Sequence, residues 1–517
     1  MASQSKSATY NACSDLLDRN VTEGRGDKLA FIDPEASLTY ADLQTQTNRF
    51  ANLMMRLGLR REDRVALVML DTIDLPIAFL GAMRAGVVPI PLNTMLSNEQ
   101  YGYMLDDSRA RVLIVSQALW PILQTTLAQL PDLQHVLVVG GDAPPGTLQF
   151  HAELSRESAE FQTARTKADE PAFWLYSSGS TGAPKGTRHV HSSAMQTAEL
   201  YAKPVLGIRE DDVVFSAAKL FFAYGLGNSL SFPMAVGATT ILNPGRPTPA
   251  TVFAFFEKYQ PTIFYGVPTL FAALLHDTAH ATHAGSPRLR ICTSAGEALP
   301  EHIGTAWKTR FGVDILDGLG STEMLHIFLS NAPGDIAYGT SGRAVPGYDL
   351  RLLDDEMKPV ADHEIGELYV RGPTAADGYW TQREKSRNTF QGEWTRTGDK
   401  YIRDANGRYT YCGRADDMFK VSGIWVSPFE VEGALTTHPA ILEAAVVPGE
   451  DEDGLLKPKA FVVLKDGVDG TGLENALKDH VKKAIGMWKY PRWIVVTDAL
   501  PKTATGKIQR FKLRELA

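Results

Sequence analysis

Apolar residues in the first third of the chain alternate between helical spacing and short continuous runs. After Thr39, which with Asp42 forms the pattern of a helix capping box, apolar residues recur at helical spacing over residues 43–57. A continuous apolar run at residues 65–70 is then typical of a buried strand. Further strands are expected at residues 87–92, 111–116 and 135–140, and a further helix opens at Ser97 and Gln100. Strands that alternate with helices predict α/β layers built on largely parallel sheets.

The pattern changes near the end of the chain. A turn signal at residues 404–407 lies between two strand-like runs. A compact α+β pattern follows residue 413, with strands expected near 444–447, 460–464 and 493–496 and a helix at about 473–484. In a chain of 517 residues we therefore expect a large N-terminal domain at residues 1–413 and a small C-terminal domain at residues 414–517.

Composition excludes several classes of protein. The formal net charge is −8 with no long block of like charge, so a nucleic-acid-binding face is not expected. The three cysteines, Cys13, Cys292 and Cys412, are far apart and have no metal-ligand spacing, which favours a reduced, cytoplasmic protein. The start of the chain has no apolar core typical of a signal peptide, and no apolar run approaches the ~20 residues of a membrane span. We therefore expect neither a nucleic acid nor a membrane among its partners.

The strongest local signal is YSSGSTGAPKG at residues 176–186, which contains three glycines and four Ser or Thr residues. Glycines let backbone N–H groups approach a phosphate closely, hydroxyl groups donate further hydrogen bonds, and Lys185 supplies positive charge. The spacing does not fit a Walker A loop, because Gly186 follows Lys185. A flexible linker is the alternative, but a linker does not need the Pro184-Lys185-Gly186 ending. The residues expected to contact phosphate are Ser177, Ser178, Gly179, Ser180, Thr181, Gly182 and Lys185.

Five further motifs follow this loop along the chain. They are SAGEAL at residues 294–299, DGLGSTE at 317–323, WTRTGDKY at 394–401, GRADDMFKVSG at 413–423 and PKTATGK at 501–507. In this order the six motifs resemble those of the adenylate-forming enzymes, which include acyl-CoA synthetases, peptide-synthetase adenylation domains and beetle luciferases. The resemblance covers nearly the whole chain. It implies a large α/β domain with a small barrel-like subdomain, and a small α+β domain on a hinge.

The resemblance implies how ATP is held. Glu323 is expected to hold Mg²⁺, whose charge offsets that of the triphosphate. Asp399 is expected to accept hydrogen bonds from the ribose hydroxyls, and Arg414 to contact ribose or phosphate. The residues expected to contact adenine or phosphate from the two central motifs are Ala295, Gly296, Glu297, Asp317 and Thr322.

The resemblance also implies two half-reactions at one site. Lys507 is expected to be catalytic, together with Thr322 and Glu323, and to bridge the acid carboxylate and the nucleotide during adenylation. Rotation about Asp416 then withdraws Lys507 and brings the Gly423 side of the hinge motif to the site, where coenzyme A attacks.

The acid is expected to lie against FFAYGLGN at residues 221–228 and LHIF at residues 325–328. These stretches, with RHVHSS at residues 188–193, resemble those of benzoate–CoA ligases, including relatives that act on hydroxybenzoates. Core packing is the alternative role for Tyr224 and His326. The residues expected to form a small, flat, mostly apolar slot for an aryl ring are Ala223, Tyr224, Gly320, His326 and Ile327.

Together these features predict an AMP-forming ligase that joins an aromatic acid, benzoate or a close analogue, to coenzyme A. ATP, Mg²⁺ and coenzyme A are the expected cofactor and co-substrates, a protein acetyltransferase acting on Lys507 is an expected partner, and the expected assembly is a monomer or homodimer. A hydroxybenzoate–CoA ligase, a stand-alone adenylation enzyme that loads a carrier protein, a luciferase-like oxygenase and a nucleotide-sensing protein are the alternatives.

The expected role of Lys507 separates the two half-reactions. We predict that Lys507→Ala abolishes most acyl-adenylate formation, because the developing negative charge loses its cation, whereas thioester formation from supplied acyl-adenylate persists. Pyrophosphate release and thioester formation, measured separately, check this. Equal loss of both activities would reject the scheme.

Overall fold

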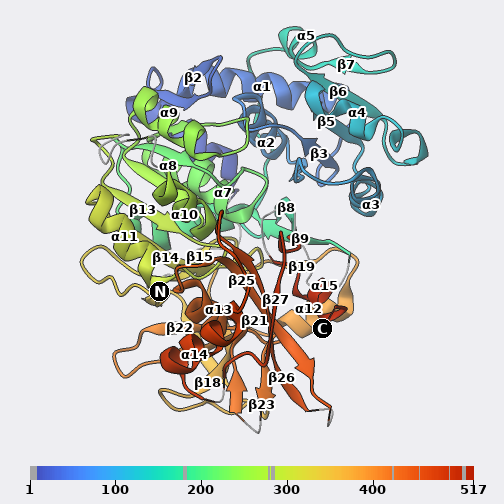
Figure 1. Cartoon of the computed structure of the whole chain (residues 1–517). Coiled ribbons are helices and arrows are strands. Elements are labelled where there is room, and N and C mark those ends of the chain that lie inside the picture. The colour runs from blue at the N-terminus through green and yellow to red at the C-terminus, as the bar shows by residue number, and fades with distance from the viewer. Residues whose placement is uncertain are drawn as a thin grey trace. The chain divides into compact units, whose positions relative to one another are not determined.

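The computed structural model describes residues 9–177, 183–277, 280, 286–421, 424–452, 455–487, 489–502 and 508–516. The chain divides into two compact units (Figure 1). Described residues of the first unit lie within 1–179, 183–349 and 371–395, and those of the second lie within 350–370 and 396–517. The expected boundary at Arg414 lies inside the second unit, and the hinge there stays a prediction.

A nine-stranded sheet forms the centre of the first unit, in the order β16-β15-β14-β13-β12-β10-β11-β1-β2. From β1 to β14 along this order the neighbouring strands are parallel, and β2 and β15 pair antiparallel with their neighbours. The strands are β1 (Leu29–Ile32), β2 (Ser37–Thr39), β10 (Val213–Ser216), β11 (Thr239–Ile241), β12 (Ile263–Gly266), β13 (Ile291–Ser294), β14 (Ile315–Gly320), β15 (Ile327–Ser330) and β16 (Arg343–Ala344).

A second, all-parallel sheet of the first unit has the order β4-β3-β5-β6-β7. Its strands are β3 (Arg64–Val68), β4 (Val88–Pro91), β5 (Val112–Ser116), β6 (His135–Val139) and β7 (Leu148–Gln149). The apolar runs predicted as strands in this part of the chain are therefore strands, and the predicted α/β class is confirmed. A third, antiparallel sheet joins β19 (Gly378–Tyr379), β9 (Lys185–Val190) and β8 (Pro171–Ser177).

Two helices of the first unit begin where the sequence predicts, and each begins with a capping box. The Thr39 side chain accepts the Asp42 N–H while Asp42 accepts the Thr39 N–H, and Ser97 and Gln100 repeat this exchange. The longer helices are α1 (Tyr40–Arg56), α2 (Asp74–Arg84), α3 (Asn98–Ser108), α9 (Pro249–Tyr259), α10 (Pro268–His276) and α11 (Glu301–Phe311). The shorter helices are α4 (Trp120–Leu123), α5 (Phe150–Ser155), α6 (His191–Thr197), α7 (Ala223–Leu226), α8 (Phe232–Val236) and α12 (Arg383–Thr389).

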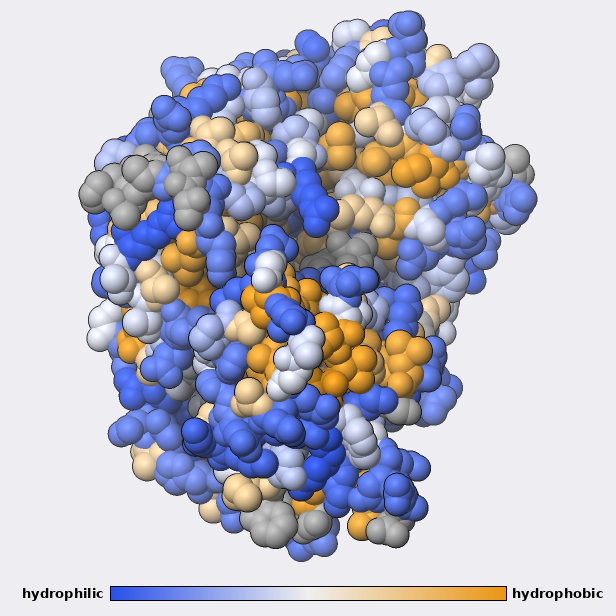
Figure 2. Space-filling view, in the orientation of Figure 1, coloured by the Kyte–Doolittle hydropathy of each residue, from blue (hydrophilic) through white to orange (hydrophobic). Residues whose placement is uncertain are grey.

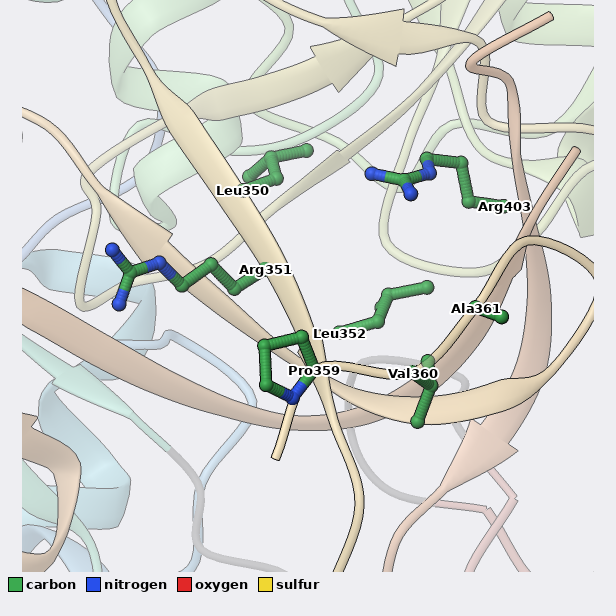
Figure 3. A pocket seen from close by; sticks show the side chains of 7 residues that line it. All are labelled: Leu350, Arg351, Leu352, Pro359, Val360, Ala361 and Arg403. Atoms are coloured by element: carbon green, nitrogen blue, oxygen red, sulfur yellow. The ribbon is translucent and has the colours of Figure 1, made fainter. Parts of the chain in front are cut away.

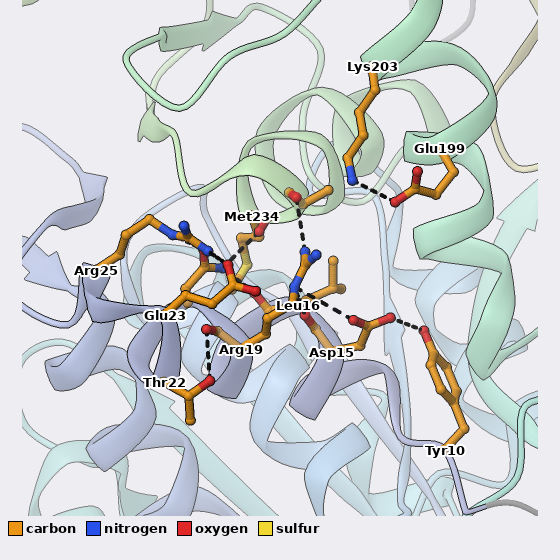
Figure 4. A network of polar contacts seen from close by, with 12 residues as sticks. Tyr10, Asp15, Leu16, Arg19, Thr22, Glu23, Arg25, Glu199, Lys203 and Met234 are labelled. Atoms are coloured by element: carbon orange, nitrogen blue, oxygen red, sulfur yellow. Dashed lines mark hydrogen bonds and ion pairs between the residues drawn. The ribbon is translucent and has the colours of Figure 1, made fainter.

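A polar network ties the N-terminal segment to the end of α8 (Figure 4). The guanidinium of Arg19 donates to the Ala235 carbonyl at 2.9 Å, and the Asn20 amide donates to the Met234 carbonyl at 2.8 Å. Asp15 accepts a 2.6 Å bond from the Tyr10 hydroxyl. These bonds therefore link the N-terminal segment to the helix that carries Phe232.

The second unit contains most of a five-stranded sheet in the order β17-β18-β21-β20, with β22 paired to β21, and a three-stranded sheet β25-β26-β27. Its last sheet is packed against α13 and α14. The strands are β17 (Asp349–Leu353), β18 (Ile365–Arg371), β20 (Phe390–Gln391), β21 (Trp394–Arg403), β22 (Tyr409–Arg414), β23 (Phe419–Val421), β24 (Ile424–Val426), β25 (Ile441–Glu450), β26 (Leu456–Leu464) and β27 (Trp493–Val496). The helices are α13 (Pro428–Thr436), α14 (Leu473–Ile485) and α15 (Arg510–Arg514).

Two surface features of the second unit lie apart from the expected site residues. A cavity of about 100 Å³ is lined by Leu352 of β17, Val360 and Arg403, with four neighbours (Figure 3). Apolar side chains gather over the region of β25 and β27, where Val495 and Val496 are exposed (Figure 2). In the part of the chain that the structure describes, no helix combines the length and apolar content that crossing a membrane requires.

The parallel strands of the nine-stranded sheet are held together at their amino ends by a buried carboxylate. Asp212, which is 3% exposed, accepts hydrogen bonds from the Arg290 guanidinium at 2.5 and 2.9 Å and from the Thr262 hydroxyl at 2.7 Å. These three residues precede β10, β12 and β13. Burial alone would raise the pKa of Asp212, but the bonds from Arg290 and Thr262 outweigh it and hold that pKa below its ordinary 3.8.

We predict that Asp212→Asn lowers the free energy of unfolding by about 3–5 kcal/mol at neutral pH, because it leaves a charge-paired network incomplete. The lowered pKa makes this contribution complete above about pH 4 and lost in more acidic solution, so the variant and the unmodified protein should converge there. Thermal and urea unfolding at several pH values check this. The exposed pair Asp335–Arg343 supplies the control: Asp335→Asn should change stability by less than about 1 kcal/mol.

Candidate functional site

The phosphate loop connects two antiparallel strands. β8 and β9 pair down to Ser177, which lies opposite Lys185, so the ends of the loop are fixed in register. The strand before the loop is β8, which ends at Ser177. Ser178, Gly179, Ser180, Thr181 and Gly182 lie outside the described residues, and their contacts with phosphate stay predictions.

Helix α3 and β19 anchor both ends of the loop. The Tyr176 hydroxyl donates to Asp107 at 2.6 Å, and the Tyr103 hydroxyl donates to the Pro184 carbonyl at 3.3 Å. The Trp380 N–H donates to the Gly186 carbonyl at 2.8 Å. Burial and the nearby Asp107 carboxylate raise the pKa of Tyr176 far above its ordinary value, so its hydroxyl stays protonated and remains a donor.

A tyrosine connects the phosphate loop to the expected Mg²⁺ ligand. The Tyr379 hydroxyl donates to Glu323 Oε1 at 2.7 Å and accepts from Lys185 Nζ at 3.2 Å. Lys185 Nζ lies 3.9 Å from Glu323 Oε1 and 4.4 Å from the centre of the Tyr379 ring. The Lys185 and Glu323 side chains are only 20% and 16% exposed, so their charges are poorly screened by water. A cation and a carboxylate therefore lie side by side at the end of the expected phosphate loop, a combination that a bound Mg²⁺–phosphate group would need.

The segment that carries Thr322 and Glu323 is a tight turn. Met324 N–H donates to the Ser321 hydroxyl at 3.2 Å, and Leu325 N–H donates to the Thr322 carbonyl at 3.2 Å. Leu325 has a φ of 67°, a left-handed conformation that is uncommon for leucine. Since such conformations persist only where the surroundings enforce them, the turn is held rigidly at the site.

The residues expected on the adenine side lie at the carboxyl ends of β13 and β14. Ala295 is buried after β13, and Gly296 and Glu297 follow it at the surface. Asp317 is buried in β14, and burial raises its pKa well above the ordinary value. Its Oδ1 atom has no hydrogen-bond partner among the described residues. An amino group that donates to this oxygen would remove an unsatisfied acceptor, so Asp317 fits the adenine role predicted for it.

The five residues expected to bind the acid come together in the first unit. Tyr224 and His326 lie with ring centres 5.6 Å apart, and His326 Nε2 is 3.2 Å from both the Tyr224 carbonyl and Asn228 Oδ1. Phe232 of α8 lies edge-on to His326 at 4.3 Å. Gly320 pairs with Ile327 across β14 and β15, and Ala223 begins α7.

Burial determines the charge of the residues expected to bind the acid. His326 is 2% exposed, and burial lowers its pKa to about 3, so the imidazole is neutral at physiological pH. Because Nε2 faces two acceptors, it carries the proton, and Nδ1 is left as a buried acceptor with no partner among the described residues. The Tyr224 hydroxyl shares a 2.6 Å hydrogen bond with Thr293. Both expected substrate-contacting rings are therefore uncharged.

In the second unit, Asp399 and Arg414 face each other across β21 and β22. Arg414 Nη1 donates to Asp399 Oδ1 at 3.0 Å and to the Thr397 carbonyl at 3.1 Å. A Cβ atom at Gly398, where φ is +73°, would lie 2.8 Å from Arg414 Nη2, so glycine permits this approach. The nearby Asp399 charge raises the pKa of Arg414. Asp399 and Arg414 are thus close together, as two groups that contact one ribose would be, and their contacts with ribose stay predictions.

The expected hinge residue Asp416 lies exposed in a turn between β22 and β23. Gly423 and Lys507 lie outside the described residues. The chain on both sides of residues 503–507 is fixed, because Lys502 and Ile508 form an antiparallel bridge and the Gln509 N–H donates to the Pro501 carbonyl at 2.8 Å.

The donor set of the first unit suits Mg²⁺ held mainly by substrate. Within the described ranges no group of three or more His, Cys, Asp or Glu side chains could hold a metal ion. Mg²⁺ commonly binds through one or two carboxylates and the phosphates of its substrate. Glu323 is the described carboxylate beside the phosphate loop, so the residues present fit that mode.

Comparison with known proteins agrees with this geometry. The family profile described as AMP-binding enzyme matches residues 17–380, and the profile described as AMP-binding enzyme C-terminal domain matches residues 430–507. The chain belongs to the AMP-binding enzyme family. The family predicted from the six motifs is thus confirmed, and phosphate loop, central motif and acid-binding segments lie within the first matched range.

AMP-binding enzymes that act on aromatic acids resemble the whole chain. A benzoate–CoA ligase of Thauera aromatica is 58% identical over 508 residues, which cover 98% of this chain and 96% of that enzyme. A 4-hydroxybenzoate–CoA/benzoate–CoA ligase of Rhodopseudomonas palustris is 56% identical over 509 residues, covering 98% and 94%. The crystal structure of a benzoate CoA ligase from Burkholderia xenovorans LB400 has a TM-score of 0.90 and 51% identity, and covers 98% of this chain and 100% of that chain.

Sequence reasoning did not identify Tyr379 or Asp107. Both are distant in sequence from the groups they hold: Tyr379 is 194 residues from Lys185, and Asp107 is 69 residues from Tyr176. A signal was present in Gly378-Tyr379-Trp380, where two aromatic residues follow a glycine. Its meaning depends on the pairing of β19 with β9, which no local pattern specifies.

We predict that Tyr379→Phe slows acyl-adenylate formation by about tenfold or more, because Lys185 and Glu323 lose the hydroxyl between them and a hydrogen bond to a charged group is removed. The half-saturating Mg²⁺ concentration should rise as well. ATP–pyrophosphate exchange at varied Mg²⁺ checks both. Tyr338→Phe, which removes a hydroxyl bonded to Asp314 away from the phosphate loop, is the control and should leave both values unchanged.

Proposed function

We propose that this protein ligates benzoate to coenzyme A through benzoyl-adenylate, releasing AMP and pyrophosphate. The observation that best supports an aromatic acid as substrate is the neutral pair of Tyr224 and His326 in the acid-binding region of the first unit. A polar but uncharged, aromatic wall suits an uncharged ring and offers no charged partner for an amino-acid ammonium group. The two benzoate-activating relatives, similar over almost the full chain, support the same substrate.

In the first half-reaction, the α-phosphorus of ATP exchanges its bond to pyrophosphate for a bond to the carboxylate. A carboxylate oxygen of benzoate attacks the α-phosphorus of ATP, the bond to the β-phosphate oxygen breaks, and pyrophosphate departs. Lys185 stabilises charge on the departing pyrophosphate, and Thr322 and the loop residues orient it. Glu323 would hold Mg²⁺, which when bound neutralises phosphate charge. Lys507 supplies the second cation, at the carboxylate.

The second half-reaction transfers the acyl group to sulfur. The coenzyme A thiol attacks the carbonyl carbon of benzoyl-adenylate, the carbon–oxygen bond to AMP breaks, and the thiol proton is released. AMP is a far better leaving group than oxide, which is why the acid must first be adenylated. Rotation at Asp416 would withdraw Lys507 and present Gly423 to coenzyme A between the two steps.

A hydroxybenzoate is the second candidate acid. It is favoured by one observation, the buried Nδ1 of His326, which has no partner among the described residues and could accept a hydrogen bond from a ring hydroxyl. The R. palustris relative bears both substrates in its name.

Several further properties belong to this proposal. The enzyme would act in the cytoplasm as a monomer or homodimer and use Mg²⁺. Acetylation of Lys507 by a protein acetyltransferase would remove the charge needed for adenylation and so switch off the first half-reaction.

We expect benzoate to give the highest kcat/KM in a panel that includes 2-, 3- and 4-hydroxybenzoate, 2-aminobenzoate, cyclohexane carboxylate and short fatty acids. Non-aromatic acids should fall behind by about tenfold or more, since they lose ring contacts worth about 1–3 kcal/mol. Thioester formation is the measurement. Pyrophosphate release with and without coenzyme A separates a CoA ligase from a carrier-loading enzyme. A fatty acid that outperforms every aromatic acid would reject the proposed substrate.

A further inference from the structure

A buried carboxylate outside the expected site lies against the acid-binding segment. Asp71 follows β3 and is 4% exposed. Its two oxygens lie 3.2 and 3.4 Å from the backbone nitrogen of Leu220, which donates to them. Leu220 lies four residues before Tyr224, at the start of the segment whose side chains are proposed to hold the acid.

Lys219 belongs to the same cluster but directs its protons elsewhere. Its ammonium donates to the Gly245 carbonyl at 2.7 Å and to the Asn243 carbonyl, both in the loop after β11. Burial raises the pKa of Asp71 and lowers that of Lys219. The opposite charge of each side chain partly offsets the effect of burial on the other. The cluster therefore joins loops after β3, β10 and β11, all at carboxyl ends of parallel strands.

Neighbouring carboxylates have other partners. Asp33 accepts the backbone N–H groups of Glu35, Ala36 and Ile73. Asp74 pairs with His151 at 2.8 Å. Of these three carboxylates, Asp71 is the one that accepts a hydrogen bond from Leu220, directly before the residues proposed to hold the acid.

The backbone from Lys219 to Gly225 is closely packed. The Phe222 N–H donates to the Lys219 carbonyl at 3.0 Å, and a Cβ atom at Gly225 would lie 2.0 Å from that carbonyl oxygen. The turn is therefore too tight to absorb a displacement. A shift at Leu220 must move Ala223 and Tyr224 relative to Thr293, which holds the Tyr224 hydroxyl.

We propose that Asp71 is a positioning residue for the acid substrate, acting on residues 219–224 through the Leu220 N–H and the charge of Lys219. This rests on the proposed function, which places the acid against Tyr224. A buried carboxylate that accepts one backbone N–H, near an ammonium whose own hydrogen bonds go to other carbonyls, is destabilising for folding, and such groups gather at functional sites.

The position of the segment should depend on pH. Burial raises the pKa of Asp71 to about 6, so this carboxylate becomes protonated in mildly acidic solution, while benzoate is still ionised. Protonation removes the negative charge that strengthens the hydrogen bond from the Leu220 N–H and attracts the Lys219 ammonium. Because the pKa is raised on folding, ionisation of Asp71 opposes folding above about pH 6, and Asp71→Asn should keep or raise the melting temperature at about pH 8.

The test compares Asp71→Ala and Asp71→Asn with the unmodified enzyme at about pH 8 and about pH 5.5. The KM for benzoate should rise about tenfold in Asp71→Ala at pH 8, as expected for loss of a hydrogen bond to a charged acceptor, and less in Asp71→Asn, which keeps an acceptor. The KM for ATP should change by less than about twofold. In the unmodified enzyme the KM for benzoate should rise between the two pH values, and in Asp71→Asn it should not.

Asp74→Asn, three residues along the same segment, is the matched control and should retain the unmodified KM values and pH profile. The proposal is overturned if Asp71→Asn keeps the unmodified pH profile, if the KM for ATP rises as much as that for benzoate, or if activity falls in proportion to a lowered melting temperature. If the unmodified enzyme does not ligate benzoate, the proposed function fails instead, and the same comparison is then made with the acid that the panel identifies.

Discussion

Parallel pairing of β10, β12, β13 and β14 determines where chemistry can occur in the first unit. In parallel strands every carboxyl end lies at the same edge of the sheet, and the loops that follow must meet there. Lys219, Ala295 and Glu323 come from three such loops, separated widely in sequence. The residues expected to bind the acid, those expected beside adenine and the expected Mg²⁺ ligand therefore follow strands that end at one edge, because of strand direction alone.

Polar groups of the expected site in the first unit are hydrogen-bonded within the protein before substrates arrive. The ends of the phosphate loop are bonded to α3 and to the chain at the end of β19, and the turn carrying Glu323 is closed by hydrogen bonds from Met324 to Ser321 and from Leu325 to Thr322. Electrostatic catalysis depends on such preorganisation, because dipoles that must reorient during the reaction contribute little. His326 illustrates the complementary effect, since burial keeps it neutral and so keeps the acid-binding region free of an extra charge.

Features that depend on local sequence could be predicted, and features that depend on distant pairing could not. The helix starts at Thr39 and Ser97 depend on residues three apart, and both helices begin as expected. The roles of Tyr379 and Asp71 arise only when β19 meets β9 and when the loop after β3 meets Leu220, 149 residues away. The expected adenine and acid residues came from motif resemblance, and the structure adds the hydrogen bonds and burial that set their charge.

The two ends of the central strands carry different groups of residues: stabilising contacts lie at one end and the expected site residues at the other. Asp212 and its partners close the amino ends, whereas Ala295, Asp317 and the acid-binding segment occupy the carboxyl ends. Substitutions at well-separated sites usually contribute independently to stability. Laboratory evolution of a new acid preference could therefore change residues at the carboxyl edge, at some loss in the free energy of unfolding. Stabilising substitutions at the amino edge, away from the expected substrate site, could restore that free energy.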